Sequence, residues 1–225
     1  FGRAARGVDD YAAMALDVTL NPDFSQVESD EPQVTVNQRF EVFFPEKRPF
    51  FLENANYFQT PIQVFFTRRI ADPQFGARLT GKQGPWALGA LVADDQAPGR
   101  VPDPLLAGRR AAFTIFRLSR DVASESTVGA VFTERRFAGG FNRVAGLDTR
   151  IKLPRQFFLQ GQALGSFTRA ASAGAGQAPT RAATAFSATL EHFGRHWSFQ
   201  NIYNDFSPDF RAQAGFVPRV DIRRN

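Results

Sequence analysis

Four carboxylates lie in or near a phenylalanine-rich run close to the start of the chain. Glu46 and Glu53 flank the aromatic part of this run, and Asp23 and Glu28 precede it. Two carboxylates on either side of a sugar ring can hydrolyse a glycosidic bond, one of them acting as an acid and the other as a base or nucleophile. No spacing among these four is diagnostic of that chemistry, because loop carboxylates commonly cap backbone groups or face water. A glycoside-active enzyme therefore remains as a third hypothesis.

Thiol and metal chemistry find little support in the composition. The chain has no cysteine, which excludes disulfides, thiol catalysis and Cys-based metal sites. The two histidines, His192 and His196, are predicted to face each other across a turn at Gly194-Arg195. Without a third ligand we expect no metal site. We expect no cofactor and no catalytic residue either, since no phosphate loop, dinucleotide fingerprint or nucleophile elbow occurs.

A larger set of charged side chains lies on strand-like segments of the second half. In a barrel these side chains would line the lumen and pair across neighbouring strands, each pair contributing about 0.2–1 kcal/mol. A solvated or structurally paired face is the simpler alternative, and a specific anion or sugar-acid site is another. The residues predicted to line the lumen are Arg117, Glu134, Arg135, Asp148, Arg150, Lys152, Arg169 and Glu191.

The elements that carry these residues alternate between apolar and polar positions. In residues 143–153, Leu147 and Ile151 fall on one face, and Asp148 and Arg150 on the other. Successive side chains of a strand point to opposite faces, so each segment has an apolar and a polar side. The predicted strands are residues 11–20, 62–69, 75–82, 86–92, 110–120, 126–136, 143–153, 156–169, 184–193, 196–206 and 216–223.

The length and spacing of these segments favour lipid as the partner of the apolar side. Membrane strands need about 9–11 residues, whereas soluble strands commonly have about 5–6. Short joins at residues 83–85, 154–155 and 194–195 alternate roughly with longer ones at residues 94–108 and 170–183. Outer-membrane barrels show the same asymmetry between their two ends. We predict an all-β, antiparallel up-and-down outer-membrane-type barrel of about ten strands, incomplete in this chain.

The bulk composition is compatible with this prediction. The 225 residues are 43% hydrophobic and are treated as a single β-barrel domain, residues 1–225. Arginines and acids are interspersed at a net charge of +5, so no nucleic-acid partner is expected. The first residues do not look like a translational start, and the last ones look like the interior of a strand. We therefore expect the chain to be a fragment of a longer protein.

Residues 21–60 differ in kind from the strands and are predicted to form an ordered, non-repetitive insert folded into the lumen. Two prolines in its central run argue against both a helix interior and a central strand. The run is Phe43, Phe44, Pro45, Glu46, Lys47, Arg48, Pro49, Phe50, Phe51, Leu52 and Glu53.

Several stretches resemble a bacterial family of unknown function. Its members join an N-terminal carbohydrate-binding module to a C-terminal predicted outer-membrane β-barrel. The resemblance rests on residues 43–53, on Arg68 and Arg69 within 66–70, and on residues 20–28, 77–82 and 215–221. It implies a location in the cell outer membrane of a Gram-negative-type cell, contact with membrane lipid, and glycans reached through a module that would precede residue 1. It carries over no catalytic residue.

The sequence thus leads to a non-enzymatic passage or scaffold in the outer membrane, linked to glycan handling. The main rival is a soluble β-sandwich that binds carbohydrate. Both structures need alternating strands, but they differ in where the apolar face lies. A sandwich buries its apolar face against a second sheet, whereas a membrane barrel turns it toward lipid.

Overall fold

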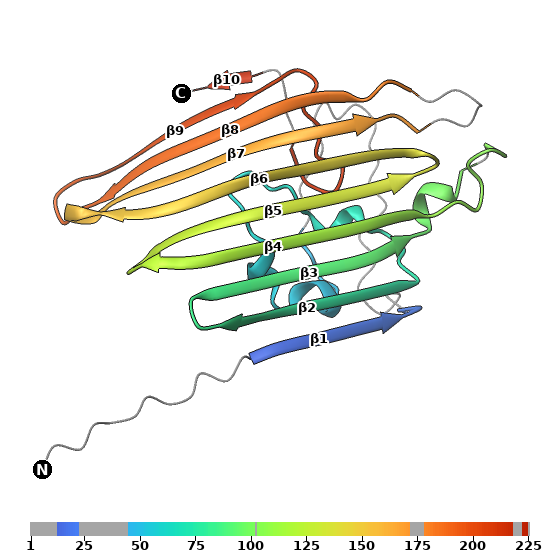
Figure 1. The fold of residues 1–225 in the computed structure, drawn as a ribbon, viewed down its shortest axis with the longest axis horizontal. Helices are drawn as coiled ribbons and strands as arrows, with labels where there is room; N and C mark the ends of the chain where they lie inside the picture. Colours follow the sequence, from blue (N-terminus) through green and yellow to red (C-terminus); the bar gives the residue numbers. More distant parts are fainter. Residues whose placement is uncertain (1–12, 23–44, 102, 172–177, 218–221, 225) are drawn as a thin grey trace, which may run out of the picture.

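The computed structural model describes residues 13–22, 45–101, 103–171, 178–217 and 222–224. Ten strands form one antiparallel sheet in which each strand pairs with the next along the chain (Figure 1). The prediction of an all-β, up-and-down antiparallel sheet is confirmed, and the sheet is open, with β1 and β10 at its edges. The strands are β1 Ala13–Leu20, β2 Phe75–Gln83, β3 Trp86–Asp95, β4 Ala111–Ala123, β5 Ser126–Phe137, β6 Gly140–Leu153, β7 Phe157–Arg169, β8 Arg181–Phe193, β9 Ser198–Phe206 and β10 Ile222–Arg224.

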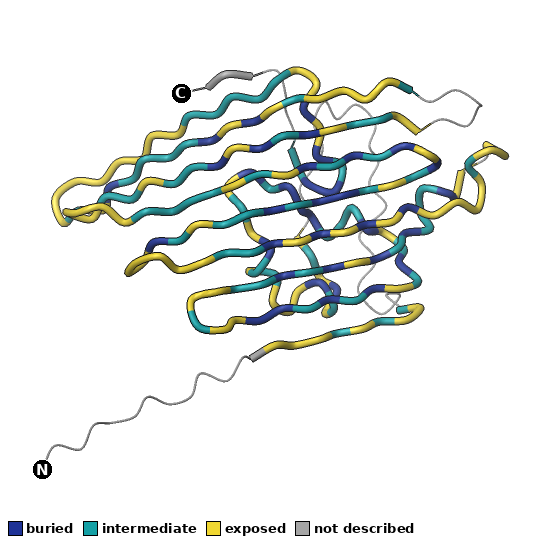
Figure 2. Tube along the Cα trace, in the orientation of Figure 1, coloured by how far each residue is buried: buried dark blue, intermediate teal, exposed yellow. Residues whose placement is uncertain are grey.

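The register confirms the alternation expected from the sequence. Leu147 of β6 pairs with Ala130 and Ala163 of the neighbouring strands, while Asp148 pairs with Gly129 and Gln162. Leu147 is 67% exposed, whereas the side chain of Asp148 is 8% exposed. We call the face that carries Leu147 the apolar face and the opposite one the covered face. Figure 2 shows the resulting alternation of buried and exposed positions along the strands.

The connections at the two ends of the sheet differ in length. At the short-turn end, the hairpins are closed by residues 84–85, 124–125, 154–156 and 194–197. Gly84 closes the first of them with a φ of 55°, a left-handed conformation that glycine adopts at little cost. At the long-loop end the connections are residues 21–74, 96–110, 138–139, 170–180 and 207–221. The predicted asymmetry therefore holds, except for the tight turn at 138–139.

Two segments from the long-loop end pack on the covered face. The first covering segment is residues 45–74 and the second is residues 207–217; both lie behind the sheet in Figure 1. The helices of the described residues are short. The first covering segment contains α1 Pro49–Leu52, η1 Ala55–Phe58 and η2 Thr67–Arg69, and connections between strands contain η3 Ala97–Gly99 and η4 Pro154–Gln156. No helix in the described part of the chain has the length and apolarity needed to span a membrane.

The hydrophobic core lies between the sheet and these covering segments, in two clusters. The first joins the first covering segment, with Ala214 of the second, to β3 and β4. The second joins both segments to β5–β8. The members of the first are Phe51, Phe58, Phe65, Ile70, Leu91, Ala93, Ala111, Phe113, Ile115 and Ala214. The second comprises Ile62, Val64, Val131, Val144, Leu164, Ala185, Phe210 and Ala212.

One predicted strand is wrong. Residues 62–66 are irregular and residues 67–69 form η2. Ile62, Val64, Phe65 and Phe66 are all buried, because this stretch is enclosed between the sheet and the second covering segment and has no solvent side. Phe66 N donates to Ala214 O at 2.8 Å, and Phe216 N donates to Gln63 O at 2.9 Å. The partners of its backbone thus come from the far end of the chain.

Candidate functional site on the covered face

A buried ion pair crosses the middle of the covered face. Arg117 of β4 reaches over β5 to Asp148 of β6, with Nη2 2.6 Å from Oδ1 and Nη1 2.6 Å from Oδ2. Gly129 of β5 lies under the guanidinium, and a Cβ there would come within 2.2 Å of Arg117 Nη1. The absence of a side chain at 129 therefore allows the pair to form across two strand spacings.

Four other predicted residues share this face. Arg135 donates to Gln213 Oε1 of the second covering segment at 3.1 Å. Arg150 stacks on Phe158, with 4.8 Å between Cζ and the ring centroid. Lys152 pairs with Glu125. Glu191 accepts a hydrogen bond from Gln200 at 2.5 Å. The covered face is thus polar toward the short-turn end and packed against the covering segments elsewhere.

Glu134 and Arg169 lie on the apolar face, contrary to the prediction. Glu134 pairs with Thr114 and Arg143 across the strands, while its neighbour Arg135 pairs with Phe113 on the covered face. Arg169 pairs with Phe141. Adjacent residues of a regular strand cannot share a face, so Glu134 and Arg135 could not both line one lumen.

The phenylalanine-rich run is anchored by its own ion pair. Phe43 and Phe44 lie outside the described residues. From Pro45 onward, Arg48 donates from Nε to Glu46 Oε1 at 2.8 Å and from Nη2 to Oε2 at 2.7 Å. The same guanidinium donates to the carbonyls of Ile70 at 2.5 Å and Thr67 at 3.0 Å, and it lies 4.3 Å from the ring centroid of Phe51. Arg48 and Glu46 therefore hold the phenylalanine-rich run against residues 67–70, near the end of the first covering segment.

Glu46 is held in its ionised form by these contacts. Burial alone would raise its pKa, but hydrogen bonds from Arg48 and Thr67, together with the charge of Arg48, lower the pKa to about 2. A general acid of glycoside hydrolysis needs a raised pKa so that it carries a proton near neutral pH. Glu53, the other flanking carboxylate, is 66% exposed and lies 3.4 Å from Arg78. Glu46 is therefore suited to a structural role.

Arg78, which belongs to the 77–82 stretch but was not among the predicted site residues, fixes the run to the sheet. Its side chain is 1% exposed and lies 2.6 Å from Asp17 of β1. It also donates to the carbonyl oxygens of Phe50 and Glu53, which end α1. An arginine in the middle of an alternating strand, opposite an aspartate on the next strand, was the available signal. The local sequence does not show that backbone carbonyls at α1 accept the other hydrogen bonds of Arg78.

Two further polar residues on the covered face bind backbone of the covering segments. Gln162 is 2% exposed and accepts a hydrogen bond from Ile62 N at 2.6 Å. Asn142 donates to Arg211 O at 2.9 Å and accepts from Gln213 N at 2.8 Å. Irregular backbone needs partners when it is buried. These polar side chains of the strands therefore hold the covering segments in place.

The two motif arginines also bind backbone. Arg68 Nε donates to Pro45 O at 2.9 Å, and Arg69 Nε donates to Gly215 O at 2.9 Å. Arg69 thereby links the first covering segment to the second, although 146 residues separate the two partners along the chain. The phenylalanine-rich run and these arginines together form one assembly on the sheet.

A cavity of about 510 Å³ lies between the first covering segment and the sheet. Phe51, Phe58, Phe65 and Leu91 provide much of its apolar wall, and Glu46 and Arg78 provide charge. This combination of aromatic walls and a few polar groups is typical of small-molecule sites. Its charged groups, however, are already engaged by the ion pairs described above.

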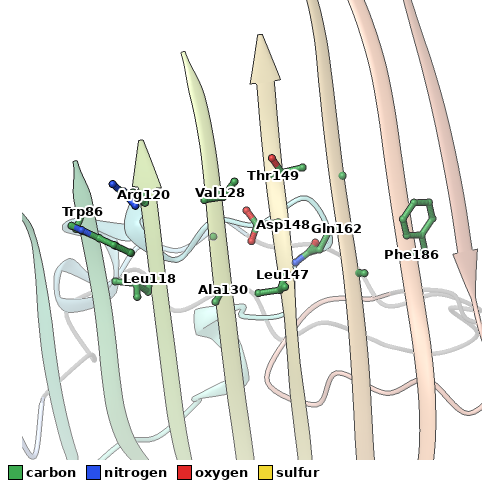
Figure 3. A pocket seen from close by; sticks show the side chains of 13 residues that line it. Trp86, Leu118, Arg120, Val128, Ala130, Leu147, Asp148, Thr149, Gln162 and Phe186 are labelled. Atoms are coloured by element: carbon green, nitrogen blue, oxygen red, sulfur yellow. The ribbon is translucent and has the colours of Figure 1, made fainter. Parts of the chain in front are cut away.

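A broad depression of about 590 Å³ also occurs on the apolar face (Figure 3). It runs from Trp86 on β3 to Phe186 on β8, and its floor contains the small residues Ala130, Gly161 and Ala163. Leu147 projects from β6 within it (Figure 3). Small side chains flanked by large ones therefore leave a shallow apolar hollow in the middle of this face.

The two histidines do not face each other. His192 pairs in register with Phe199 and stacks on Trp197, with 4.0 Å between ring centroids, while His196 lies in the turn. Phe157, Trp197 and Phe199 extend this aromatic cluster at the short-turn end. Within the described residues, no three metal-binding side chains are grouped.

Comparison with known proteins finds a family model that matches part of the chain. A model described as "Domain of unknown function (DUF5916)" matches residues 7–82, a range that contains β1, the phenylalanine-rich run and β2. No curated protein matches the chain. No solved structure matches it either. The part of the chain that joins Arg78, Asp17 and α1 is therefore similar to a domain family of unknown function.

Proposed function

We propose that this chain forms part of an outer-membrane β-barrel whose interior is occupied by its own covering segments. In this role it acts as a scaffold or as a gated passage, and not as an open pore. The single observation that carries the proposal is the exposed apolar face, which lies opposite a face that is already covered and holds both the hydrophobic core and buried polar side chains.

The apolar face is extensive. Leu16, Val18 and Leu20 of β1 are 69%, 57% and 72% exposed, and on the opposite half of the sheet Leu147 is 67% and Phe167 is 48% exposed. Soluble monomers rarely expose contiguous apolar patches larger than a few hundred Å². Hydrocarbon tails would cover all of these side chains at once, because they belong to one face of one sheet.

Strand length and end asymmetry support the same proposal. Strands β4–β8 have 12 to 14 residues each, enough to cross the hydrocarbon core at the usual tilt. Short turns at one end and long connections at the other are typical of outer-membrane barrels, with the short turns on the periplasmic side. The aromatic cluster around Trp197 then lies at the height of a membrane interface.

The soluble sandwich is less well supported. It would leave polar side chains in water and bury the apolar ones under a second sheet. Instead Gln162 is 2% exposed and Asp148 is buried in an ion pair. Within the described residues, both covering segments lie on the face opposite Leu147 and Phe167.

The covering segments argue for a filled interior. They supply buried residues to both core clusters, and side chains of the strands satisfy their backbone groups. In lipid, an open sheet would leave the edge groups of β1 and β10 without partners. The barrel that we propose therefore closes with strands beyond the ten described here.

Cysteine accessibility tests the proposal directly, since the chain has no cysteine. Leu147→Cys places a thiol on the apolar face, and Val101→Cys places one in a long connection. In intact cells a membrane-impermeant maleimide should label Cys at 101 and not at 147. Detergent unfolding should then make position 147 reactive, which shows that lipid had protected it.

An Arg155→Cys variant provides the matched control at the short-turn end. It should react only after the outer membrane is permeabilised, because that end faces the periplasm. Labelling of position 147 in intact or permeabilised cells without unfolding would contradict the proposal. Recovery of the chain in a soluble fraction without detergent would contradict it as well.

A further inference from the structure

Four arginines gather on the apolar face at the long-loop end. Arg110 directly precedes β4, and Arg136, Arg143 and Arg169 come from β5, β6 and β7. They line a depression of about 560 Å³ together with Phe141. The strand register explains the cluster, because Ala112, Arg136, Phe141 and Arg169 form one cross-strand row. Glu134 and Arg143 are partners in the next row.

The cluster carries more positive than negative charge. Asp94 binds Arg110 at 3.0 Å. Glu134 binds the Nε atoms of Arg136 at 2.8 Å and Arg143 at 2.5 Å. Among the described residues, Asp94 and Glu134 thus pair with three of the four guanidinium groups, and Arg169 donates to Thr180 Oγ1 at 3.3 and 3.4 Å. Glu134 contacts both arginines through Nε. A guanidinium group carries five N–H donors, and its planar fork matches a phosphate geometrically.

Phe141 orients the same groups. Cζ of Arg143 lies 4.5 Å from its ring centroid, and Cζ of Arg169 lies 5.0 Å from it. Stacking on an aromatic ring is favourable for guanidinium and limits its motion. The arginines are therefore held beside one another before any anion binds, which lowers the entropic cost of binding.

The rows below the cluster are apolar. Moving toward the short-turn end, the next cross-strand rows contain Phe116, Phe132 and Ala145, and then Leu118, Ala130 and Leu147. A positively charged border directly above a broad apolar surface matches the two parts of an anionic lipid. The headgroup would lie among the arginines while its acyl chains follow the strands toward Leu147.

We propose that the Arg110–Arg136–Arg143–Arg169 depression binds the phosphate headgroup of an anionic lipid. This inference rests on the proposed function, since it requires the apolar face to meet lipid. The chemistry recognised is a phosphate anion, and the neighbouring apolar rows assign its source to a lipid and not to free phosphate in solution.

The experiment compares lipid binding to the full chain in nonionic detergent by native mass spectrometry. The probes are phosphatidylglycerol and phosphatidylcholine with identical acyl chains. We expect wild type to retain phosphatidylglycerol about 10- to 30-fold better, as two arginines near an anionic surface imply. Arg136→Gln combined with Arg143→Gln should remove this preference, while Arg100→Gln, in the loop between β3 and β4, should preserve it.

A second variant guards against loss of folding. Adding Glu134→Gln to the double substitution removes the carboxylate that the arginines neutralise, and it should likewise abolish the preference with an unchanged circular dichroism spectrum. An unchanged preference in either variant overturns the inference. Displacement of the lipid by millimolar inorganic phosphate would also overturn it, by showing a site for free phosphate.

Flotation separates this inference from the proposed function. Chain that floats with phosphatidylcholine vesicles but shows no phosphatidylglycerol preference contradicts only the headgroup site. Chain that does not float with vesicles of either composition contradicts the proposed function itself.

Discussion

At the scale of single residues, the contacts of the covered face depend on a glycine as much as on charged side chains. Arg117 and Asp148 belong to strands that are not neighbours, and they meet only because Gly129 lies between them. A buried pair of this kind adds little net stability when it is intact, but breaking it leaves a charge without a partner. Gly129 is therefore important because it leaves room for the guanidinium group of Arg117.

We expect Gly129→Ala to destabilise the protein by about 1–3 kcal/mol, because the new methyl group displaces the guanidinium from a buried carboxylate. The matched control is Gly161→Ala, where the nearest side-chain atom would be 3.8 Å away. Urea unfolding in lipid vesicles measures both. In a Gly129→Ala background, Asp148→Asn should cost less than it does alone; additive effects would refute the proposed mechanism.

At the scale of elements, the first covering segment is held to the sheet by polar contacts at each end. Arg78 binds the carbonyl oxygens that end α1, and Arg48 with Glu46 closes the run onto Thr67 and Ile70. The three helices of this segment have only three or four residues each and are too short to be stable alone. The segment is therefore ordered by the sheet, through partners that lie far away in the sequence.

Acid should weaken this attachment. The pKa of Glu46 lies at about 2, below its ordinary value of 4.5, so its contribution to stability is complete above pH 4.5 and is lost as the pH falls toward 2. Relative to Glu46→Gln, wild type should be more stable by up to about 3 kcal/mol at neutral pH. The difference should shrink between pH 4.5 and 2, and limited proteolysis within residues 45–74 would follow it.

The control for this pH profile is Glu53→Gln. Glu53 is largely exposed and lies 3.4 Å from Arg78, so its replacement should change the stability by less than about 1 kcal/mol. A Glu46→Gln profile parallel to that of wild type down to pH 2 would show that Glu46 does not stabilise the segment through its charge.

At the scale of the whole molecule, apolar side chains occur on both faces of the sheet, but only one face is covered. The covered face holds the hydrophobic core together with buried polar side chains, whereas leucine and phenylalanine side chains on the apolar face are exposed. Charged rows occupy the long-loop border of the apolar face, and the Trp197 aromatic cluster lies at the short-turn border. Such an order of polarity along the strands is typical of proteins that cross a membrane.

On the proposed membrane location, Leu147→Arg should destabilise the vesicle-inserted protein by about 2–4 kcal/mol, because Leu147 lies midway along β6 and the arginine would place a charge in hydrocarbon. Ala112→Arg, in the charged border row, should cost about 0–1 kcal/mol. Urea titration of protein folded into vesicles gives both values. Equal and negligible costs at the two positions would mean that water, and not lipid, covers this face.

The sequence by itself determined most of the strands and, within each strand, which residues share a face. The side-chain period of two is a local property of extended backbone, so the pairing of Leu147 with Ile151 against Asp148 with Arg150 needed no tertiary information. The same rule places Glu134 and Arg135 on opposite faces, and likewise Arg169 and Gln162. The prediction that Glu134 and Arg169 line the lumen was therefore wrong because this local rule was not applied to them.

Only the tertiary structure decided what covers each face. Residues 62–66 have the composition of a strand but become irregular, because they are enclosed between the sheet and a segment about 150 residues later in the chain. Arg78, Asn142 and Gln162 look like ordinary polar strand residues until the backbone that they bind is in place. Contacts between distant segments follow from loop closure and packing, which no local pattern encodes.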